Sequence, residues 1–222
     1  MKAAIIVAGG TGSRMSSPTP KQFLLLKEIP VLMHPINAFF RFDPSIRILL
    51  ALPESLFSEW VALLQRYNLT IPHELVPGGA TRFHSVFNCL QRLAPEGMVA
   101  IHDGARPLVS QELLHRLFTL AEEKGNAVPV VPVTESIREL AGSSSRPSDR
   151  SLFRIVQTPQ VFQTALIQEA YTQSYRSEFT DDATVLESTG IPICLASGDP
   201  INLKITFPSD LVTAEALMKS GK

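Results

Sequence analysis

The chain has 222 residues, of which 45% are hydrophobic and 18% are charged, and its formal net charge is −1. This composition excludes an intrinsically disordered chain, and the nearly balanced charge excludes a protein that binds nucleic acid through a broad basic surface. The two cysteines lack a metal-ligand spacing, no apolar run reaches membrane-spanning length, and the N-terminus enters an apolar strand directly. We therefore expect a cytoplasmic protein without nucleic-acid or membrane partners.

Short apolar runs alternate with helical patterns as far as residue 133, and this alternation predicts βα units around a mostly parallel sheet. The predicted strands are residues 3–7, 46–52, 72–76, 98–101 and 127–133. The predicted helices are residues 54–67, 85–93 and 110–123, the last with Ser110 as its N-cap. The fold class that this alternation indicates is α/β.

The alternation stops after residue 133. Residues 134–140 and 151–156 flank the polar segment 141–148, which contains four serines and is too long for a tight hairpin turn. We predict two strands that leave the body as an arm and are joined by this polar turn. A disordered surface loop explains the same composition equally well.

The βα pattern then resumes. A helix is predicted near residues 163–175, another begins at Asp181 or Asp182, and strands follow at 191–195 and 203–205. A last helix is predicted at 208–218, with Pro208 in its first turn. The chain thus reads as one domain, residues 1–222, with an excursion at residues 134–156.

A glycine-rich loop follows the first predicted strand. Residues 7–15 read Val-Ala-Gly-Gly-Thr-Gly-Ser-Arg-Met, and three glycines in four positions let the backbone approach an anion and turn N–H groups toward it. The loop lacks the Gly-Lys-Ser/Thr ending of a Walker loop, and Met15 replaces the third glycine of a dinucleotide fingerprint. Arg14 and Lys21 supply two cations, which suits a triphosphate whose leaving pyrophosphate gains charge during transfer. These features predict a nucleotidyltransferase.

The run from Ala8 to Met15, followed by Pro-Lys-Gln-Phe-Leu at residues 20–24, resembles the motif of sugar-nucleotide pyrophosphorylases. More narrowly, it is similar to that of the cytidylyltransferases acting on 2-C-methyl-D-erythritol 4-phosphate in the non-mevalonate isoprenoid pathway. Four later blocks carry the resemblance over nearly the whole chain: Gly-Gly-Ala-Thr-Arg-Phe-His-Ser-Val at 78–86, Ile-His-Asp-Gly-Ala-Arg-Pro at 101–107, Gln-Thr-Pro-Gln at 157–160 and Asn-Leu-Lys-Ile-Thr at 202–206.

The resemblance implies a Rossmann-like, three-layer nucleotidyltransferase fold with a mostly parallel sheet and a protruding β-arm. It implies transfer of CMP from CTP to the polyol phosphate with release of pyrophosphate, assisted by Mg²⁺ or another divalent cation. It also implies a homodimer, with the arm at residues 134–156 as the dimerisation element.

On the nucleotide side, the resemblance assigns binding to Ala8, Gly9, Gly10, Thr11, Gly12, Gly79, Ala80, Ser85 and Asp103, and catalysis to Arg14 and Lys21. Asp103 follows a predicted strand, where ligands of open α/β sheets bind, and it can accept bonds from ribose or hold a metal-bound water. The resemblance assigns no direct metal ligand. An Asp103–Arg106 ion pair that only fixes the loop is the structural alternative. The family often has acidic residues at positions 80 and 84, so Ala80 and His84 remove side-chain contacts but leave backbone recognition.

Ser85 also fits the N-cap of the predicted helix at 85–93. Asp181 and Asp182 resemble a family Thr-Asp-Asp element, and capping a helix explains them as well as catalysis does.

On the acceptor side, the resemblance places Lys204 over the transferred phosphate, although strand alternation alone predicts an exposed side chain. Arg150, eight residues before Thr158, matches an arginine that grips the acceptor phosphate from the partner subunit. Arg106, Ser136 and Thr158 are expected near the acceptor. Ser136 stands where the family has threonine, so the hydroxyl is retained.

The acceptor is a phosphate monoester with a second pKa of about 6, so it is largely a dianion at neutral pH and needs no general base. One alternative is a cytidylyltransferase for another polyol phosphate, such as D-ribitol 5-phosphate. A transferase for hexose 1-phosphates is disfavoured by the chain length and by residues 202–206. A non-catalytic nucleotide sensor is disfavoured because Arg14, Lys21, Arg150 and Lys204 are all present.

Overall fold

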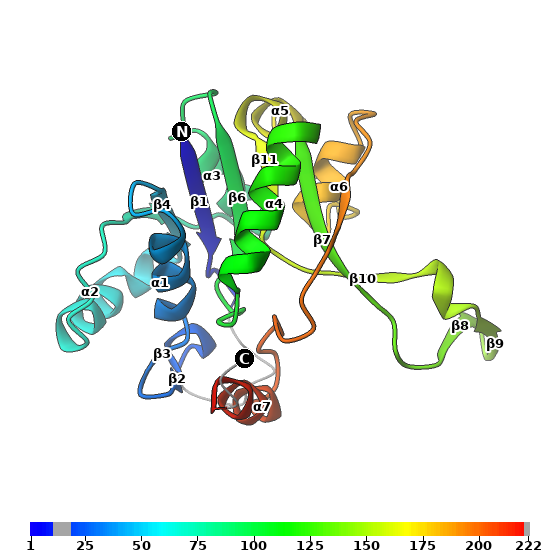
Figure 1. Cartoon of the computed structure of the whole chain (residues 1–222), viewed down its shortest axis with the longest axis horizontal. Coiled ribbons are helices and arrows are strands. Elements are labelled where there is room, and N and C mark those ends of the chain that lie inside the picture. Colours follow the sequence, from blue (N-terminus) through cyan, green and yellow to red (C-terminus); the bar gives the residue numbers. More distant parts are fainter. Residues whose placement is uncertain (11–18, 220–222) are drawn as a thin grey trace.

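The apolar runs pair side by side into a central sheet, and the computed structural model, which describes residues 1–10 and 19–219, carries helices on both faces of it (Figure 1). The strand order is β10-β7-β11-β6-β1-β4-β5, with β12 paired to β7. The strands are β1 (Lys2–Val7), β4 (Arg47–Leu52), β5 (Glu74–Pro77), β6 (Met98–Asp103), β7 (Asn126–Pro132), β10 (Arg154–Val156), β11 (Gln160–Gln163) and β12 (Leu195–Ser197). Strands β6, β1, β4 and β5 are parallel, as an α/β fold requires.

The helices are α1 (Met33–Phe42), α2 (Phe57–Arg66), α3 (Arg82–Leu90), α4 (Gln111–Lys124), α5 (Thr164–Ala170), α6 (Asp182–Glu187) and α7 (Pro208–Lys219). Short 3₁₀ turns occur at Lys21–Phe23, Glu54–Leu56 and Arg150–Leu152, and β2 (Leu25–Leu26) pairs with β3 (Ile29–Pro30) in a small hairpin. Among the described residues, no helix has both the length and the apolar character needed to cross a membrane.

Alternating residues of β1 belong to two hydrophobic cores, one on each face of the sheet. Ala4 and Ile6 are buried on one face of the sheet with residues of α1 and α4, whereas Ala3 and Ile5 are buried on the other with residues of α3 and α5. Because both faces are covered, the central strands are apolar throughout rather than alternating with polar residues. This explains why their positions were predicted correctly from the sequence.

Helix α4 also matches its prediction. The Ser110 side chain accepts a hydrogen bond from the Leu113 N–H at 3.2 Å, and the helix ends at Gly125, whose φ of +90° suits a glycine. By contrast, α1 and β11 were not predicted. Strand β11 is antiparallel to both β6 and β7, so the sheet is mixed at the point where the parallel part ends.

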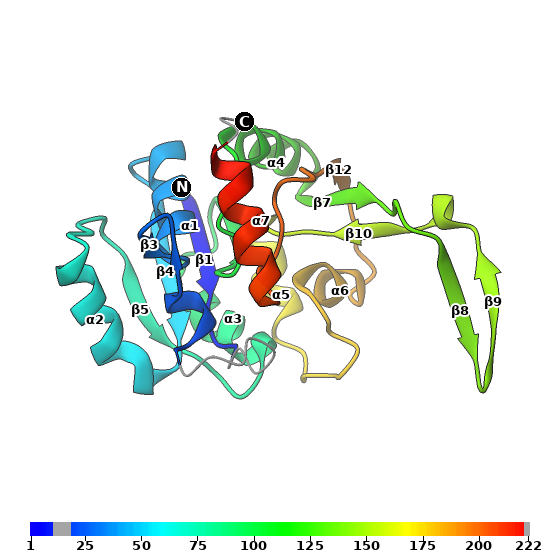
Figure 2. The same cartoon turned by 90° about the horizontal axis from the view of Figure 1, so that it is seen from below.

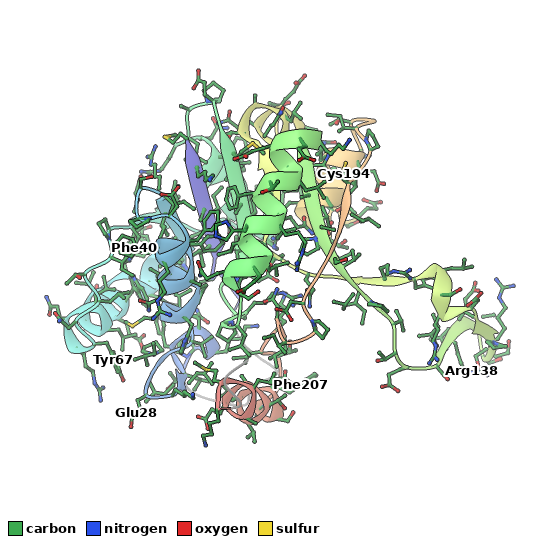
Figure 3. The ribbon with its side chains drawn as sticks, in the orientation of Figure 1. Glu28, Phe40, Tyr67, Arg138, Cys194 and Phe207 are labelled. Carbon is green, nitrogen blue, oxygen red and sulfur yellow. The ribbon has the colours of Figure 1, made fainter. Side chains whose placement is uncertain are left out.

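The arm differs from its prediction. Residues 144–148, expected in a long polar turn, form strand β9 (Ser144–Ser148), which pairs with β8 (Ile137–Ala141) in a separate two-stranded ribbon that projects from the body (Figure 2). A tight turn is possible because Gly142 has a φ of +59°. Arg138 lies on this ribbon, far from the sheet (Figure 3). Residues 154–156, expected in the arm, instead pair with β7 as β10.

Two C-terminal strand predictions are wrong. Residues 191–194 are irregular, and only the short β12 pairs with β7. Residues 203–205 form no strand, because single hydrogen bonds and not a ladder hold the segment: Arg106 Nη1 donates to the Asn202 carbonyl at 2.7 Å, and the Ile205 N–H donates to the Ala105 carbonyl at 2.8 Å. This extended segment lies beside the loop that follows β6.

Candidate functional site

A cavity opens at the carboxyl ends of β1 and β6, where the glycine-rich loop begins. Nine of the residues predicted as site residues line it: Ala8, Gly9, Gly10, Lys21, Gly79, Ala80, Ser85, Asp103 and Lys204. They come from four segments far apart in the sequence. The parallel strands bring the first three segments together because their carboxyl ends meet at one edge of the sheet, and hydrogen bonds to Ala105 and Arg106 hold the segment of Lys204 beside them. Thr11, Gly12 and Arg14 lie outside the described residues.

The loop before α3 forms one wall of this cavity. The Gly79 N–H donates to Ser85 Oγ at 3.0 Å, and Ser85 Oγ in turn donates to the Thr81 carbonyl at 3.0 Å. A Cβ on Gly79 would lie 2.3 Å from the Cβ of His84, so only glycine fits there without a shift. Thr81, not Ser85, is the N-cap, and α3 begins at Arg82. The N-cap alternative for Ser85 is therefore wrong, because that residue lies within the helix and ties the loop to it.

Asp103 is the charged centre of the site. Lys204 Nζ lies 2.7 Å from Asp103 Oδ2, and Arg82 Nε lies 3.3 Å from Oδ1. Burial alone would raise the pKa of this carboxyl, but the positive charges of Arg82 and Lys204 hold it well below its usual range. Arg106 Nε is farther away, at 3.9 Å from Oδ2. Asp103 is thus an anion shared by several cations, not half of a simple Asp103–Arg106 pair.

A second cavity adjoins the first. Its lining includes Arg106 and Thr158, two of the predicted acceptor residues, and it shares Arg82, Asp103 and Lys204 with the first cavity. Thr158 Oγ1 accepts a hydrogen bond from the Asp103 N–H at 3.0 Å. Two ligands that fill the two cavities would therefore meet at the three shared charged groups.

Arg106 and Lys21 both donate hydrogen bonds to the segment that carries Lys204. Arg106 is only 9% exposed, and burial lowers the pKa of its guanidinium. Lys21 Nζ donates to the Ile205 carbonyl at 3.4 Å, and a Cβ on Gly10 would lie 3.8 Å from Lys21 Cε. Lys21 therefore reaches the glycine-rich side of the site and Arg106 the second cavity.

His102 precedes Asp103 but is fully buried. Its Nε2 donates to the Arg106 carbonyl at 3.0 Å, and Thr158 Oγ1 lies 3.3 Å from its Nδ1. Burial lowers the pKa of His102 to about 4, so the ring is neutral near pH 7. His102 fixes the loop and the Thr158 hydroxyl.

The arm residues do not reach these cavities within one chain. Arg150 is exposed and donates through Nη1 to the Thr134 carbonyl, and Ser136 is exposed at the base of the ribbon. Within the described part of the chain, neither belongs to the lining of either cavity. Their acceptor roles stay predictions.

Sequence reasoning missed Arg82. It lies in the block at 78–86, yet only the fold shows that its Nη1 and Nη2 bind Asp182 at 2.8 and 2.6 Å while Nε faces Asp103. Asp181 is the N-cap of α6 in a capping box with Thr184, which confirms the capping alternative for that residue. A basic residue inside a glycine-containing block was the only available signal.

Comparisons with known proteins agree with this geometry. A family model described as 2-C-methyl-D-erythritol 4-phosphate cytidylyltransferase matches residues 2–220. Relatives with that name include one from Phocaeicola vulgatus, 45% identical over 96% of this chain and 98% of the relative. Another, from Porphyromonas gingivalis, is 47% identical over 98% of this chain and 97% of the relative. The crystal structure of the Thermus thermophilus enzyme of that name covers 97% of this chain and 98% of its own, with a TM-score of 0.78 and 33% identity.

Proposed function

The chain belongs to the 2-C-methyl-D-erythritol 4-phosphate cytidylyltransferase family, and from this premise we propose how its residues divide the reaction between two cavities. The reaction transfers CMP from CTP to 2-C-methyl-D-erythritol 4-phosphate and gives 4-diphosphocytidyl-2-C-methyl-D-erythritol and pyrophosphate. The observation that carries the division is the set of charged groups common to both cavities, Arg82, Asp103 and Lys204.

The first cavity would hold the nucleotide. Backbone groups of Gly9, Gly10 and Gly79 face it, and Lys21 reaches the side where the triphosphate would lie. The second cavity would hold the acceptor beside Arg106 and Thr158. Transfer forms a bond from an acceptor phosphate oxygen to the α-phosphorus and breaks the bond from that phosphorus to the oxygen of the leaving pyrophosphate. Because the acceptor is already a dianion, the protein's task is alignment and charge stabilisation.

A divalent cation, Mg²⁺ or another, fits this site only as a companion of the triphosphate. Among the residues that the structure describes, no group of three or more His, Cys, Asp or Glu side chains gathers as metal ligands. Of the described carboxylates, Asp103 is the one shared by the two cavities, and its Oδ2 already pairs with Lys204. Such a donor set suits an ion bound mainly by phosphate and water, with Asp103 in contact through water. When bound, the ion neutralises phosphate charge.

The arm supports a homodimer. Leu140 on the ribbon is 82% exposed, and Leu152 beside it is 79% exposed. Large apolar side chains with this exposure on a projecting arm are typical of a surface that another protein covers. If the arm packs against a second copy, Arg150 and Ser136 would reach the partner's acceptor cavity, since neither lines that cavity in its own chain. Arg150 would then bind the acceptor phosphate in trans. The cytoplasmic location stays a prediction.

Alanine at Gly9 tests how closely the nucleotide approaches the backbone, and alanine at Gly79 tests the stability of the fold. A Cβ on Gly9 would meet Ser85 Oγ at 3.7 Å, an ordinary contact, so Gly9→Ala should leave Tm nearly unchanged. It should raise KM for CTP about tenfold, because the methyl occupies space the nucleotide needs. Gly79→Ala should lower the stability by about 1–3 kcal/mol because of its clash with His84, which lowers Tm by several degrees. Thermal melts and steady-state kinetics measure both effects. Equal losses of Tm would contradict the distinction.

The activity itself is tested by pyrophosphate release from CTP and Mg²⁺, with methylerythritol phosphate and ribitol phosphate as parallel acceptors. We expect release with the first and at least tenfold lower kcat/KM with the second, since the acceptor cavity must reject a hydroxyl pattern that it cannot pair. A preference for ribitol phosphate would favour the alternative acceptor. Absence of release with either would favour the nucleotide sensor.

A further inference from the structure

A carboxylate with no exposure to solvent binds Arg82, one of the charged groups shared by the two cavities. Asp182 is 0% exposed and receives three hydrogen bonds: from Arg82 Nη1 at 2.8 Å, from Arg82 Nη2 at 2.6 Å and from the Tyr171 hydroxyl at 2.6 Å. A buried carboxylate is costly unless it is fully paired. The bidentate pair of hydrogen bonds from Arg82 is the geometry that holds a guanidinium most rigidly.

The surroundings keep Asp182 in place. Gln160 donates through Nε2 to Asp181 Oδ2 at 2.7 Å and accepts from the Ala183 N–H at 2.8 Å, so it grips both neighbours of Asp182. The Tyr171 ring stacks on Phe83 with 4.5 Å between centroids, and Phe83 follows Arg82 in α3. Tyr171 is therefore packed against the helix that carries Arg82, and Gln160 fixes Asp182 through its two neighbours.

Only one nitrogen of the Arg82 guanidinium remains to face the site. Its two Nη atoms face Asp182, so only Nε points to Asp103, at 3.3 Å from Oδ1. The other carboxylate oxygen, Oδ2, is then left for Lys204 at 2.7 Å. Oδ1 of Asp103 thus pairs with Arg82 and Oδ2 with Lys204, while Arg106 Nε is farther from Oδ2 at 3.9 Å, and Lys204 lines both cavities.

We propose that Asp182 and Tyr171 are positioning residues, which restrain Arg82 so that Asp103 can hold Lys204 at the junction of the two cavities. Neither lines the first cavity, and they act only through Arg82. The inference rests on the proposed function, because it explains how the lysine assigned to the transferred phosphate is kept in place before the ligands bind.

Asp182→Asn should release Arg82. The nearest carboxylate is then Asp103, and a free guanidinium can bind both of its oxygens at once, which displaces Lys204. We expect kcat to fall about tenfold or more, with KM for CTP changed less than about threefold, because the loss acts on alignment in the transition state. Tyr171→Phe removes one of the three bonds to Asp182 and should lower kcat about threefold.

A second readout does not depend on activity. In the substrate-free protein at pH 8, acetylation of Lys204 by an N-hydroxysuccinimide ester, followed by mass spectrometry, reports how firmly its amine is held. Relative to Lys124, we expect the Lys204 rate to rise about threefold or more in Asp182→Asn and to a smaller extent in Tyr171→Phe. Tyr175→Phe is the matched control, since Tyr175 packs on the same Phe83 ring but is 42% exposed.

The double variant Arg82→Met/Asp182→Asn tests whether the released Arg82 is what displaces Lys204. Without Arg82, the guanidinium expected to displace Lys204 is absent, so labelling should return close to the parent rate, and both members of the former Arg82–Asp182 pair are neutral. A general loosening of the fold would instead raise labelling further. If Asp182→Asn fails to fold, Tyr171→Phe and the double variant carry the test.

Unchanged Lys204 labelling in the single variants, or no return in the double variant, would overturn the proposal. An inactive parent with the expected labelling changes would leave the positioning inference standing and defeat the proposed function. An active parent with unchanged labelling would overturn the positioning inference and leave the proposed function standing.

Discussion

Lys21→Ala is expected to lower kcat for CMP transfer by about 10²- to 10³-fold, with a much smaller change in KM for CTP. Lys21 reaches the glycine-rich side of the nucleotide cavity, next to Gly10 and the Ile205 carbonyl. The charge on the leaving pyrophosphate grows as the bond to the α-phosphorus breaks, so a cation there stabilises the transition state more than the bound substrate. Steady-state kinetics with pyrophosphate detection separates kcat from KM.

Lys27→Ala is the matched control. Lys27 lies six positions later, and its Nζ donates to the Met218 carbonyl at 2.9 Å, on the α7 side of the molecule. Kinetics close to those of the parent are expected, because no charge develops there. An increase in KM for CTP with unchanged kcat in Lys21→Ala would contradict the assignment, since it would show equal binding of ground and transition states.

Arg150→Ala is expected to raise KM for methylerythritol phosphate by about 10- to 100-fold, with little effect on KM for CTP. Loss of charge-assisted hydrogen bonds to a phosphate costs about 1.5–3 kcal/mol, which corresponds to that range. Arg138→Ala is the control, because Arg138 lies on the same arm and donates to Ser145 Oγ at 2.8 Å and to the Ser145 carbonyl at 2.9 Å. Equal and small effects of Lys21→Ala and Arg150→Ala on kcat/KM would overturn the division of roles.

Mixing the two variants tests whether Arg150 acts in trans. In a heterodimer of Lys21→Ala with Arg150→Ala, one site carries both defects and the other carries neither. After subunit exchange, half of the dimers are mixed, so about a quarter of the parental activity should return when the acceptor concentration is well below the parental KM, where both variants are slow. Activity no higher than the mean of the two variants would place Arg150 at the site of its own chain or outside both sites.

Local sequence patterns predicted the elements whose stability is local or whose burial is complete. Strands β1, β4 and β6 were recognisable because they are apolar on both faces, and α4 was bounded by its own capping residue and glycine. Predictions failed where a strand forms through its pairing partner and has no apolar pattern of its own. The segment 144–148 is polar and contains Pro147, yet it forms β9 because β8 offers a partner.

The sequence by itself determined the reaction class. A glycine-rich loop, its neighbouring cations and four ordered motif blocks are contiguous features, and they identified the family before any contact was known. The sequence also placed Asp103 after a strand, at the edge where ligands bind.

Only the tertiary structure decided how the charges are shared. Arg82 and Asp182 are 100 positions apart, and Lys204 reaches Asp103 from an extended segment that was predicted as a strand. The strength of such pairs depends on distance and burial, which sequence spacing does not contain. The same limit explains why a helix N-cap was an alternative role for Ser85: its hydrogen bond with the Gly79 N–H exists only because α3 begins earlier and folds the loop back onto it.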